Sequence, residues 1–195
     1  MKTSIFVTVI MLSACVWTRG EEEDETVAHL TLSSPSFQNG QPIPAKYSCK
    51  GENASPALNW EGVPAGTKSF ALICDDPDAP GGSWVHWVIY GIPANTVSLP
   101  ENIQKRDAVE APGSMSGRGD ANSPGAKQGV NDFGKVGYGG PCPPRGRGAH
   151  HYDFQLYALD AELKLAPRAT RKQLKAAMKG HIIGEAELSG SYQRD

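Results

Sequence analysis

The chain is 195 residues long, carries a formal net charge of −2 at pH 7 and is 39% hydrophobic. This length favours one folded domain, and the hydrophobic share is enough to bury a core, so a wholly disordered chain is excluded. The sequence contains no basic tract that could neutralise a phosphate backbone, and we therefore expect no nucleic-acid partner.

The N-terminus has the pattern of an export signal. Lys2 gives it a positive start, and the apolar stretch that follows, residues 5–14, is too short for a normal transmembrane helix. Leu12-Ser13-Ala14-Cys15 resembles a bacterial lipobox, in which the cysteine becomes the lipidated first residue. An ordinary signal peptide that happens to have a cysteine nearby is the alternative.

The segment after Cys15 is strongly acidic, with Glu21-Glu22-Glu23-Asp24-Glu25 at its centre. A run of like charges is typical of a solvated, extended spacer. We predict a lipoprotein-type signal peptide over residues 1–15 with Cys15 lipidated, a spacer over 16–26 and a folded domain over 27–195. Such a protein is exported and held at the cell envelope, on its periplasmic or extracellular face, by the lipid anchor.

The rest of the chain is rich in short apolar segments separated by turns. Their alternating or continuous apolar residues predict strands over 30–32, 58–60, 69–74, 85–92, 152–159 and 182–192. The strand at 69–74 is continuously apolar, so we expect it to be central in a sheet. Residues 101–131 are rich in Gly, Ser, Pro and Asn, and they indicate a long surface excursion.

Only one segment has clear helical spacing. Thr170 is a candidate N-cap, Leu174 and Met178 repeat at helical spacing, and Gly180 is a candidate end. Many short strands with one or two short helices argue for a mostly β fold, a β-sandwich-like domain.

If Cys15 carries lipid, three cysteines remain, and they can form at most one internal bridge. Cys74 ends an apolar run and is expected to be a small buried hydrophobic residue. Cys49 and Cys142 lie beside turn residues, and an exported protein meets an oxidising space. We predict a disulfide between Cys49 and Cys142.

Two turns rich in Gly or Pro lead into strands that begin with histidine and aromatic residues. The first is Asp75-Asp76-Pro77-Asp78-Ala79-Pro80, followed by Trp84-Val85-His86-Trp87. The second is Gly137-Tyr138-Gly139-Gly140-Pro141-Cys142-Pro143-Pro144, followed by Gly148-Ala149-His150-His151-Tyr152. Because proline fixes φ and glycine permits positive φ, such turns can hold polar groups in one geometry.

Strand alternation assigns these side chains to faces. His150 and Tyr152 share a face and His151 points away, while Trp84 shares a face with His86, and Val85 with Trp87. Asp76 and Asp78 can orient imidazoles by accepting an N–H. If the two turns converge, their imidazoles, carboxylates and phenol form a small pocket that suits a phosphate-sized anion.

In combination, these segments resemble the phosphatidylethanolamine-binding protein family, which includes the Raf kinase inhibitor proteins and bacterial relatives. The resemblance covers nearly all of residues 30–192. It implies a two-sheet β fold with a small anion pocket that takes phosphate or a phospholipid head group. The site residues that it implies are Asp76, Pro80, His86, Pro143, Pro144, His150 and Tyr152.

The resemblance also implies a non-enzymatic binding protein that inhibits a protease or a kinase by contact. One position departs from the pattern, because the family normally has His-Arg-Tyr where this chain has His150-His151-Tyr152. Arg is permanently charged and His is not. An ion pair that the family makes with this Arg, with Asp78 as the candidate partner, is therefore in question here.

Two other functions compete with binding. A hydrolase of phosphate or carboxyl esters could use His86 or His150 as a base oriented by Asp76, but Gly113-Ser114-Met115-Ser116-Gly117 has Met at the centre of what would be a nucleophile elbow. A metal site could use the same histidines, but no His-x-x-x-His or Cys-x-x-Cys pair supports it. We expect no metal and no cofactor.

Overall fold

The structure is a computed structural model that describes residues 27–109 and 125–194. The predicted signal peptide, Cys15, the acidic spacer and the Gly113–Gly117 segment lie outside the described residues. Within the described ranges, no helix has the length and apolar character needed to cross a membrane.

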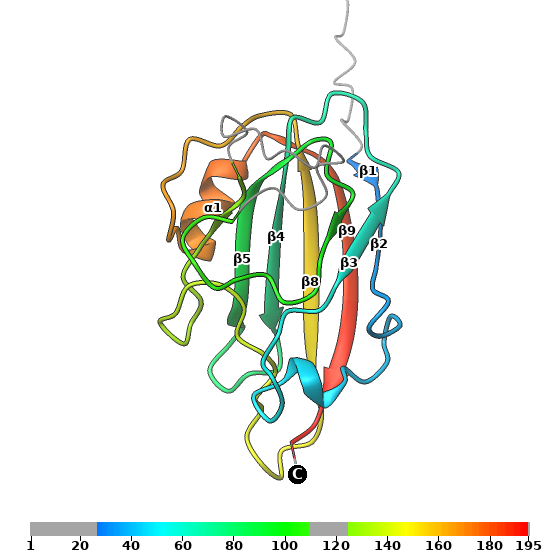
Figure 1. Cartoon of the computed structure of the whole chain (residues 1–195), viewed down its shortest axis with the longest axis vertical. Helices are drawn as coiled ribbons and strands as arrows, with labels where there is room; N and C mark the ends of the chain where they lie inside the picture. Colours follow the sequence, from blue (N-terminus) through cyan, green and yellow to red (C-terminus); the bar gives the residue numbers. More distant parts are fainter. Residues whose placement is uncertain (1–26, 110–124, 195) are drawn as a thin grey trace, which may run out of the picture.

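Two β-sheets form the domain (Figure 1). The larger sheet has six strands in the order β1-β9-β8-β4-β5-β7, and the smaller has three in the order β2-β3-β6. The larger sheet consists of β1 (Ala28–His29), β9 (Ile182–Tyr192), β8 (His150–Leu159), β4 (Ser69–Asp76), β5 (Trp84–Pro93) and β7 (Lys127–Gln128). The smaller sheet consists of β2 (Thr31–Ser33), β3 (Leu58–Glu61) and β6 (Ser98–Leu99). The described helices are α1 (Arg171–Met178) and the single 3₁₀ turn η1 (Ala45–Tyr47), so the mostly β, two-sheet expectation is confirmed.

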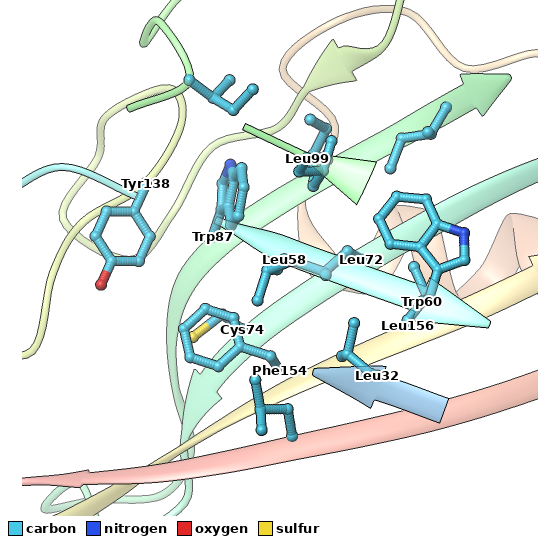
Figure 2. Close-up of a cluster of buried hydrophobic side chains, with 14 of the residues drawn as sticks. Leu32, Leu58, Trp60, Leu72, Cys74, Trp87, Leu99, Tyr138, Phe154 and Leu156 are labelled. Atoms are coloured by element: carbon cyan, nitrogen blue, oxygen red, sulfur yellow. The ribbon is translucent and has the colours of Figure 1, made fainter. Parts of the chain in front are cut away.

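The main core lies between the two sheets. Figure 2 shows Leu58 and Trp60 of β3 over Leu72 and Leu156 of the larger sheet. The indole of Trp60 also packs edge-on against Phe70, with ring centroids 5.4 Å apart. β4 is buried along its whole length between β8 and β5, which confirms that the apolar segment at 69–74 is central.

The second face of the larger sheet is covered by α1. Leu174 and Met178 pack there against Ala71 and Ile73 of β4. The helix begins as predicted, because the Thr170 hydroxyl accepts the N–H of Gln173 and the Gln173 side chain accepts the N–H of Thr170. Burial of both faces explains why β4 reads as continuously apolar rather than alternating.

The faces of the sheet predicted for the side chains are correct for β8 and wrong for β5. Tyr152, Phe154 and the alternate residues after them point into the core between the sheets. In β5, however, Cys74 pairs with Trp87 while Asp75 pairs with Val85, so His86 is an extra residue in a β-bulge. Val85 therefore joins the cluster under α1 and Trp87 joins the core between the sheets, and the expectation that they share a face is wrong.

The prediction that residues 101–131 form a surface excursion is also wrong for the last residues of that range. There the chain returns to the larger sheet as β7, where Gln128 pairs with Ile89 and is fully buried. The Gln128 side chain accepts the indole N–H of Trp87 at 2.9 Å and donates to the carbonyls of Gln104 and Arg106. These bonds hold the start of the excursion against β5.

Strand β9 spans the larger sheet from end to end. Its first residues pair with β1, where Ala28 is opposite Gly184, and this pairing is parallel. Its last residues pair with the start of β8, where His150 is opposite Tyr192. The domain therefore begins at one end of the sheet and brings His150 to the other, where the C-terminus also lies (Figure 1).

Candidate anion site

Four polar side chains gather at the end of the sheet where β4 finishes and where β5 and β8 begin. Asp76 is the last residue of β4, His86 occupies the bulge of β5, and His150 and Tyr152 open β8. All four are buried: His86 is 2% exposed, Asp76 and His150 are each 4% exposed, and Tyr152 is fully covered. Polar side chains buried to this degree need partners.

Asp76 orients the ring of His150. Its carboxylate accepts a hydrogen bond from His150 Nδ1 at 2.8 Å, and its other oxygen accepts the backbone N–H of Asp78 at 2.9 Å. The turn after β4 thus fixes the carboxylate, and the carboxylate fixes the imidazole. Since a carboxylate can only accept, Nδ1 carries the hydrogen and Nε2 is the free position of the neutral ring.

His86 is held in the same way by a backbone group. Its Nδ1 lies 2.6 Å from the carbonyl oxygen of Gly139, which can only accept, so Nδ1 is again the donor and Nε2 is free. Burial lowers the pKa of His86, against opposing effects from the Gly139 carbonyl and the charge of Asp76. The neutral form is therefore favoured at neutral pH.

Tyr152 supplies a phenol that has no partner. Its ring stands edge-on to His86, with centroids 5.0 Å apart and planes at 89°. Its Oη is buried and makes no hydrogen bond within the described residues, although the Asp76 carboxylate and the backbone N–H of Cys142 lie close to it. Burial, together with the Asp76 charge, raises the pKa of Tyr152, so the phenol keeps its proton and remains a donor.

The resulting site has three polar atoms left over. Among residues 27–109 and 125–194, no group hydrogen-bonds Nε2 of His86, Nε2 of His150 or Oη of Tyr152. The two Nε2 atoms become donors when the rings take up protons, and the phenol is a donor at every physiological pH. Three such donors are chemically suited to the oxygens of one small anion.

The three prolines of the predicted site are placed differently from these four residues. Pro143 is buried next to Cys142, whereas Pro80 and Pro144 are exposed in their turns. A role for them at the rim of the pocket stays a prediction.

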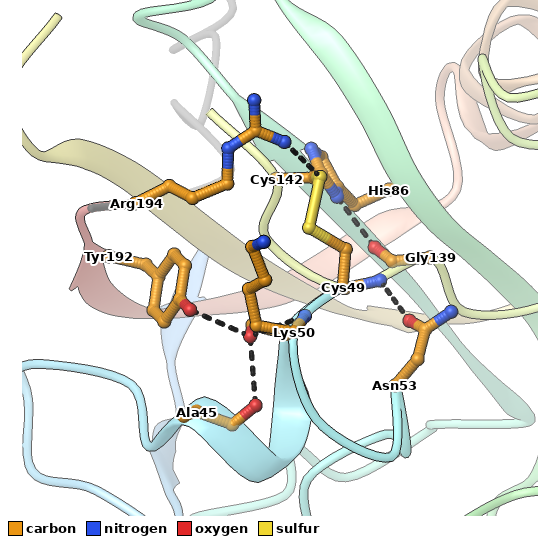
Figure 3. The surroundings of a disulfide bond; sticks show 11 residues. Ala45, Cys49, Lys50, Asn53, His86, Gly139, Cys142, Tyr192 and Arg194 are labelled. Carbon is orange, nitrogen blue, oxygen red and sulfur yellow. Dashed lines mark hydrogen bonds between the residues drawn. A yellow bond between two sulfur atoms is a disulfide. The ribbon is translucent and has the colours of Figure 1, made fainter. Parts of the chain in front are cut away.

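The predicted disulfide is present and fixes the second turn. Cys49 and Cys142 are joined with their Cα atoms 5.4 Å apart, beside the bond between His86 and Gly139 (Figure 3). The turn is also tied by the N–H of Cys49 to the carbonyl of Pro141, at 3.0 Å, and by the N–H of Gly140 to Asn53 Oδ1, at 2.6 Å. Cys74 is a buried free thiol, as expected.

Sequence reasoning missed two groups that contact the site. One is the backbone carbonyl of Gly139, which sequence cannot reveal because every residue type has a backbone carbonyl. The other is Phe133, which is 42% exposed and stands edge-on to His86 and to Trp84, with ring centroids 5.2 and 5.5 Å away. The only available signal for it was an aromatic residue among the turn residues of Asn131-Asp132-Phe133-Gly134.

Asp78 makes hydrogen bonds to His151, the position at which an ion pair with an Arg was in question. Asp78 Oδ2 accepts both the backbone N–H of His151, at 2.8 Å, and its ring Nδ1, at 2.7 Å. These two bonds lower the pKa of Asp78. His151 is exposed while His150 and Tyr152 are buried, as strand alternation predicted.

Within the described residues, no three side chains of His, Cys, Asp or Glu are grouped so that they could hold a metal ion. Asp76 and His150 bond each other directly, and His86 faces a carbonyl and two aromatic rings.

Comparison with known proteins agrees with this fold. The sequence model of the family described as phosphatidylethanolamine-binding protein matches residues 33–193, and the chain belongs to this family. A UPF0098 protein of Aquifex aeolicus is 48% identical over 169 residues, covering 86% of this chain and 91% of that protein. LppC of Mycobacterium tuberculosis, a candidate lipoprotein by its name, is 43% identical over 165 residues, covering 84% of this chain and 72% of that protein.

Two solved structures share the architecture. CT736 of Chlamydia trachomatis, described as a phosphatidylethanolamine-binding protein homolog, is 39% identical with a TM-score of 0.72, covering 86% of this chain and 99% of its own. YbcL of Escherichia coli, described as a member of the mammalian family, is 35% identical with a TM-score of 0.73, covering 86% of this chain and all of its own, 100%. Family membership supports a binding protein in general terms.

Proposed function

We propose that the protein binds a small phosphate-bearing ligand, free or as a phospholipid head group, through His86, His150 and Tyr152. The observation that carries this proposal is the unpartnered phenol of Tyr152, buried between Asp76 and the imidazole of His86. A buried polar group without a partner costs about 1–3 kcal/mol, which a ligand oxygen at this position relieves.

Binding is coupled to protons. Both rings use Nδ1 for the protein, so each neutral ring offers a lone pair at Nε2, which repels a fully ionised oxyanion. This repulsion is removed when a phosphate monoester binds with a P–O–H proton that it donates to Nε2, or when Nε2 of one ring is protonated on binding. Charge-assisted bonds contribute about 1.5–3 kcal/mol each, so an isolated phosphate group should bind in the micromolar to millimolar range.

The test is calorimetric titration of the full chain with inorganic phosphate at pH 6, comparing His150→Ala with a matched histidine variant. His181 is suitable for the match because it also bonds a carboxylate through Nδ1, that of Asp160 at 2.8 Å, but on the exposed surface. We expect His150→Ala to weaken binding at least about tenfold and His181→Ala to leave it unchanged. Equal affinities in both variants would overturn the proposal.

Two further ligands separate the sources of the phosphate group. Glycerophosphoethanolamine tests the head group alone, and vesicles of phosphatidylethanolamine test the lipid in a bilayer. If glycerophosphoethanolamine binds as tightly as the vesicles do, the ligand is a soluble phosphate ester. If only the vesicles bind, the ligand is a lipid.

A hydrolase of phosphate or carboxyl esters is the second candidate function. The bond between Asp76 and His150 favours it, because a carboxylate that orients an imidazole is the usual arrangement of a general base. Turnover of p-nitrophenyl phosphate or p-nitrophenyl acetate that disappears in His150→Ala, and not in His181→Ala, would favour this reading over simple binding.

The cellular setting is part of the same proposal. We infer export and a lipid anchor at Cys15, supported by the lipobox pattern and by the name of LppC. Detergent phase partitioning of the native protein tests this, since Cys15→Ser should move it into the aqueous phase. We also propose that the protein inhibits a protein partner, a protease or a kinase, by contact. The test measures the activity of such an enzyme after addition of the purified parent domain or of its His86→Ala variant.

A further inference from the structure

A cavity of about 670 Å³ is lined in part by Gly139, Gly140 and Cys142, which belong to the turn beside the anion site. It shares Phe133, Gly139 and Cys142 with the surroundings of the anion site, but neither histidine nor Tyr152 lines it. A volume of this size is in the range that holds a small organic ligand. It is therefore a separate space that the proposed function does not use.

The charged lining of this cavity is unbalanced. Lys105, Arg106, Lys135 and Arg168 line it, against the single carboxylate of Asp107, which leaves an excess of three positive charges. The whole chain has a formal net charge of −2, so the excess is local. A concave site lined by one sign of charge concentrates ligands of the opposite sign.

Ion pairs within residues 27–109 and 125–194 neutralise little of this charge. Asp107 pairs with Arg168 at 3.2 Å. Within the described ranges, no carboxylate pairs with Lys105, Arg106 or Lys135, and the Lys105 ammonium donates only to the carbonyl of Asn53, at 2.7 Å. Burial and the nearby charge of Lys135 lower the pKa of Lys105, as expected for cations that lack an anion between them.

The remaining lining is largely apolar. Tyr138 also contributes to the wall, but it is only 2% exposed, and the Lys105 ammonium lies 6.0 Å from its ring centroid. Phe133, which is 42% exposed, forms another part. The ring of Phe133 is therefore the aromatic surface that a planar ligand would contact.

We propose that this cavity is a second ligand site, which takes an apolar ring carrying two or more carboxylate or phosphate groups. The ring packs on Phe133, and the anionic groups pair with Lys105, Arg106 and Lys135. The inference goes beyond the proposed phosphate site and does not depend on it, since the two sites share a wall but no charged side chain.

The test uses benzene-1,3,5-tricarboxylate as the probe, with benzoate and citrate as comparisons, titrated into the full chain by calorimetry. We expect the tricarboxylate to bind at least about tenfold more tightly than benzoate, because its three carboxylates meet Lys105, Arg106 and Lys135. It should also bind more tightly than citrate, which has the charges but no ring. Raising the salt concentration should weaken it.

Paired variants decide where the probe binds. Arg106→Gln with Lys135→Gln removes two charges from the cavity, and Lys172→Gln with Lys175→Gln removes two from the exposed surface of α1. We expect at least about a tenfold loss in the first double variant and none in the second. His150→Ala, which disables the phosphate site, should leave tricarboxylate binding intact, so failure of one proposal is distinguishable from failure of the other.

Two results would overturn the second site. One is a tricarboxylate affinity no greater than that of benzoate. The other is an equal loss in the cavity variant and the helix variant, which would mean that the probe responds only to overall charge. Amide shifts in an NMR titration add a direct readout, because occupancy of the cavity should move Tyr138 and Lys135 before residues of β8.

Discussion

His86 and Gly139 are joined by two hydrogen bonds in opposite directions. The ring Nδ1 of His86 donates to the Gly139 carbonyl at 2.6 Å, and the N–H of Gly139 donates to the His86 carbonyl at 2.8 Å. The bulge of β5 and the Gly-rich turn are thereby fixed to each other through backbone and side chain together. These two hydrogen bonds position Nε2 of His86, the ring nitrogen that is left for a ligand.

The first prediction concerns the pH dependence of phosphate binding and of stability. Because burial lowers the pKa of His86, the NMR titration of its ring should have a midpoint below 6.5 in the free protein. Phosphate should raise that midpoint, so affinity should increase as the pH falls. A midpoint at or above 6.5 in the free protein contradicts this account.

The same shift sets the sign of a stability change. Below pH 6.5 the unfolded chain binds a proton at His86 more readily than the folded chain does, so the unfolding free energy falls as the pH drops from 6.5 toward the folded pKa. Above pH 6.5 this contribution is constant. His86→Gln should flatten this part of the profile, measured by urea denaturation.

The second prediction concerns the phenol of Tyr152. Tyr152→Phe removes an unpartnered buried hydroxyl, so the unfolding free energy of the free protein should stay constant or rise by about 1 kcal/mol, while phosphate binds several-fold more weakly. Tyr138→Phe is the matched control. Its hydroxyl donates to the carbonyl of Tyr47 at 2.9 Å, so that variant should lose about 1 kcal/mol and keep its phosphate affinity. A larger loss of stability in Tyr152→Phe than in the control would show that the phenol has a structural partner.

The third prediction concerns the disulfide. The bridge closes a loop with a sequence separation of 93 residues, so reduction should lower the unfolding free energy by about 2–5 kcal/mol. Since the bridge holds the turn whose Cys142 N–H lies near Tyr152, phosphate affinity should also fall. Denaturation of Cys74→Ala with and without reductant measures the first effect, and calorimetry the second. Alkylation of both Cys49 and Cys142 in unreduced protein would exclude the bridge.

The fourth prediction concerns Asp78 and His151. The folded pKa of Asp78 is lowered, so its contribution to stability is present above the unfolded value of 3.8 and is lost as the pH falls below it. The pair is largely exposed, with side chains 43% and 59% accessible, so solvent screening limits the effect to about 0.5 kcal/mol. Asp78→Asn should show a shallower acid-side loss than the parent protein. An identical acid-side profile would mean that this pair makes no contribution.

The strands could be predicted because their patterns are local. Burial on both faces makes 69–74 continuously apolar, and the core position of Tyr152 and Phe154 makes 152–159 alternate. The pairing of Cys49 with Cys142 followed from their turn positions and from the expected oxidising compartment.

The details of the site could not be predicted, because they depend on contacts distant in sequence. The bulge at His86 appears only when β5 is aligned with β4, so alternation put Val85 and Trp87 on one face. The partner of His86 is a carbonyl 53 residues away, and a carbonyl has no residue-type signature. Asp78 was already the candidate partner of position 151, but its two hydrogen bonds to His151 depend on the ends of β4 and β8 being adjacent.

The parallel pairing of β1 with β9 places the first described residues at the end of the sheet opposite the anion site. The described chain enters the domain where Ala28 meets Gly184, and His150 lies opposite Tyr192, about 25 Å further along the same strand. Val27 therefore lies near the end of the sheet that is opposite His150. If a bilayer held the domain at that end, the anion site would lie at the far end of the sheet, where dissolved phosphate esters would reach it before membrane lipids.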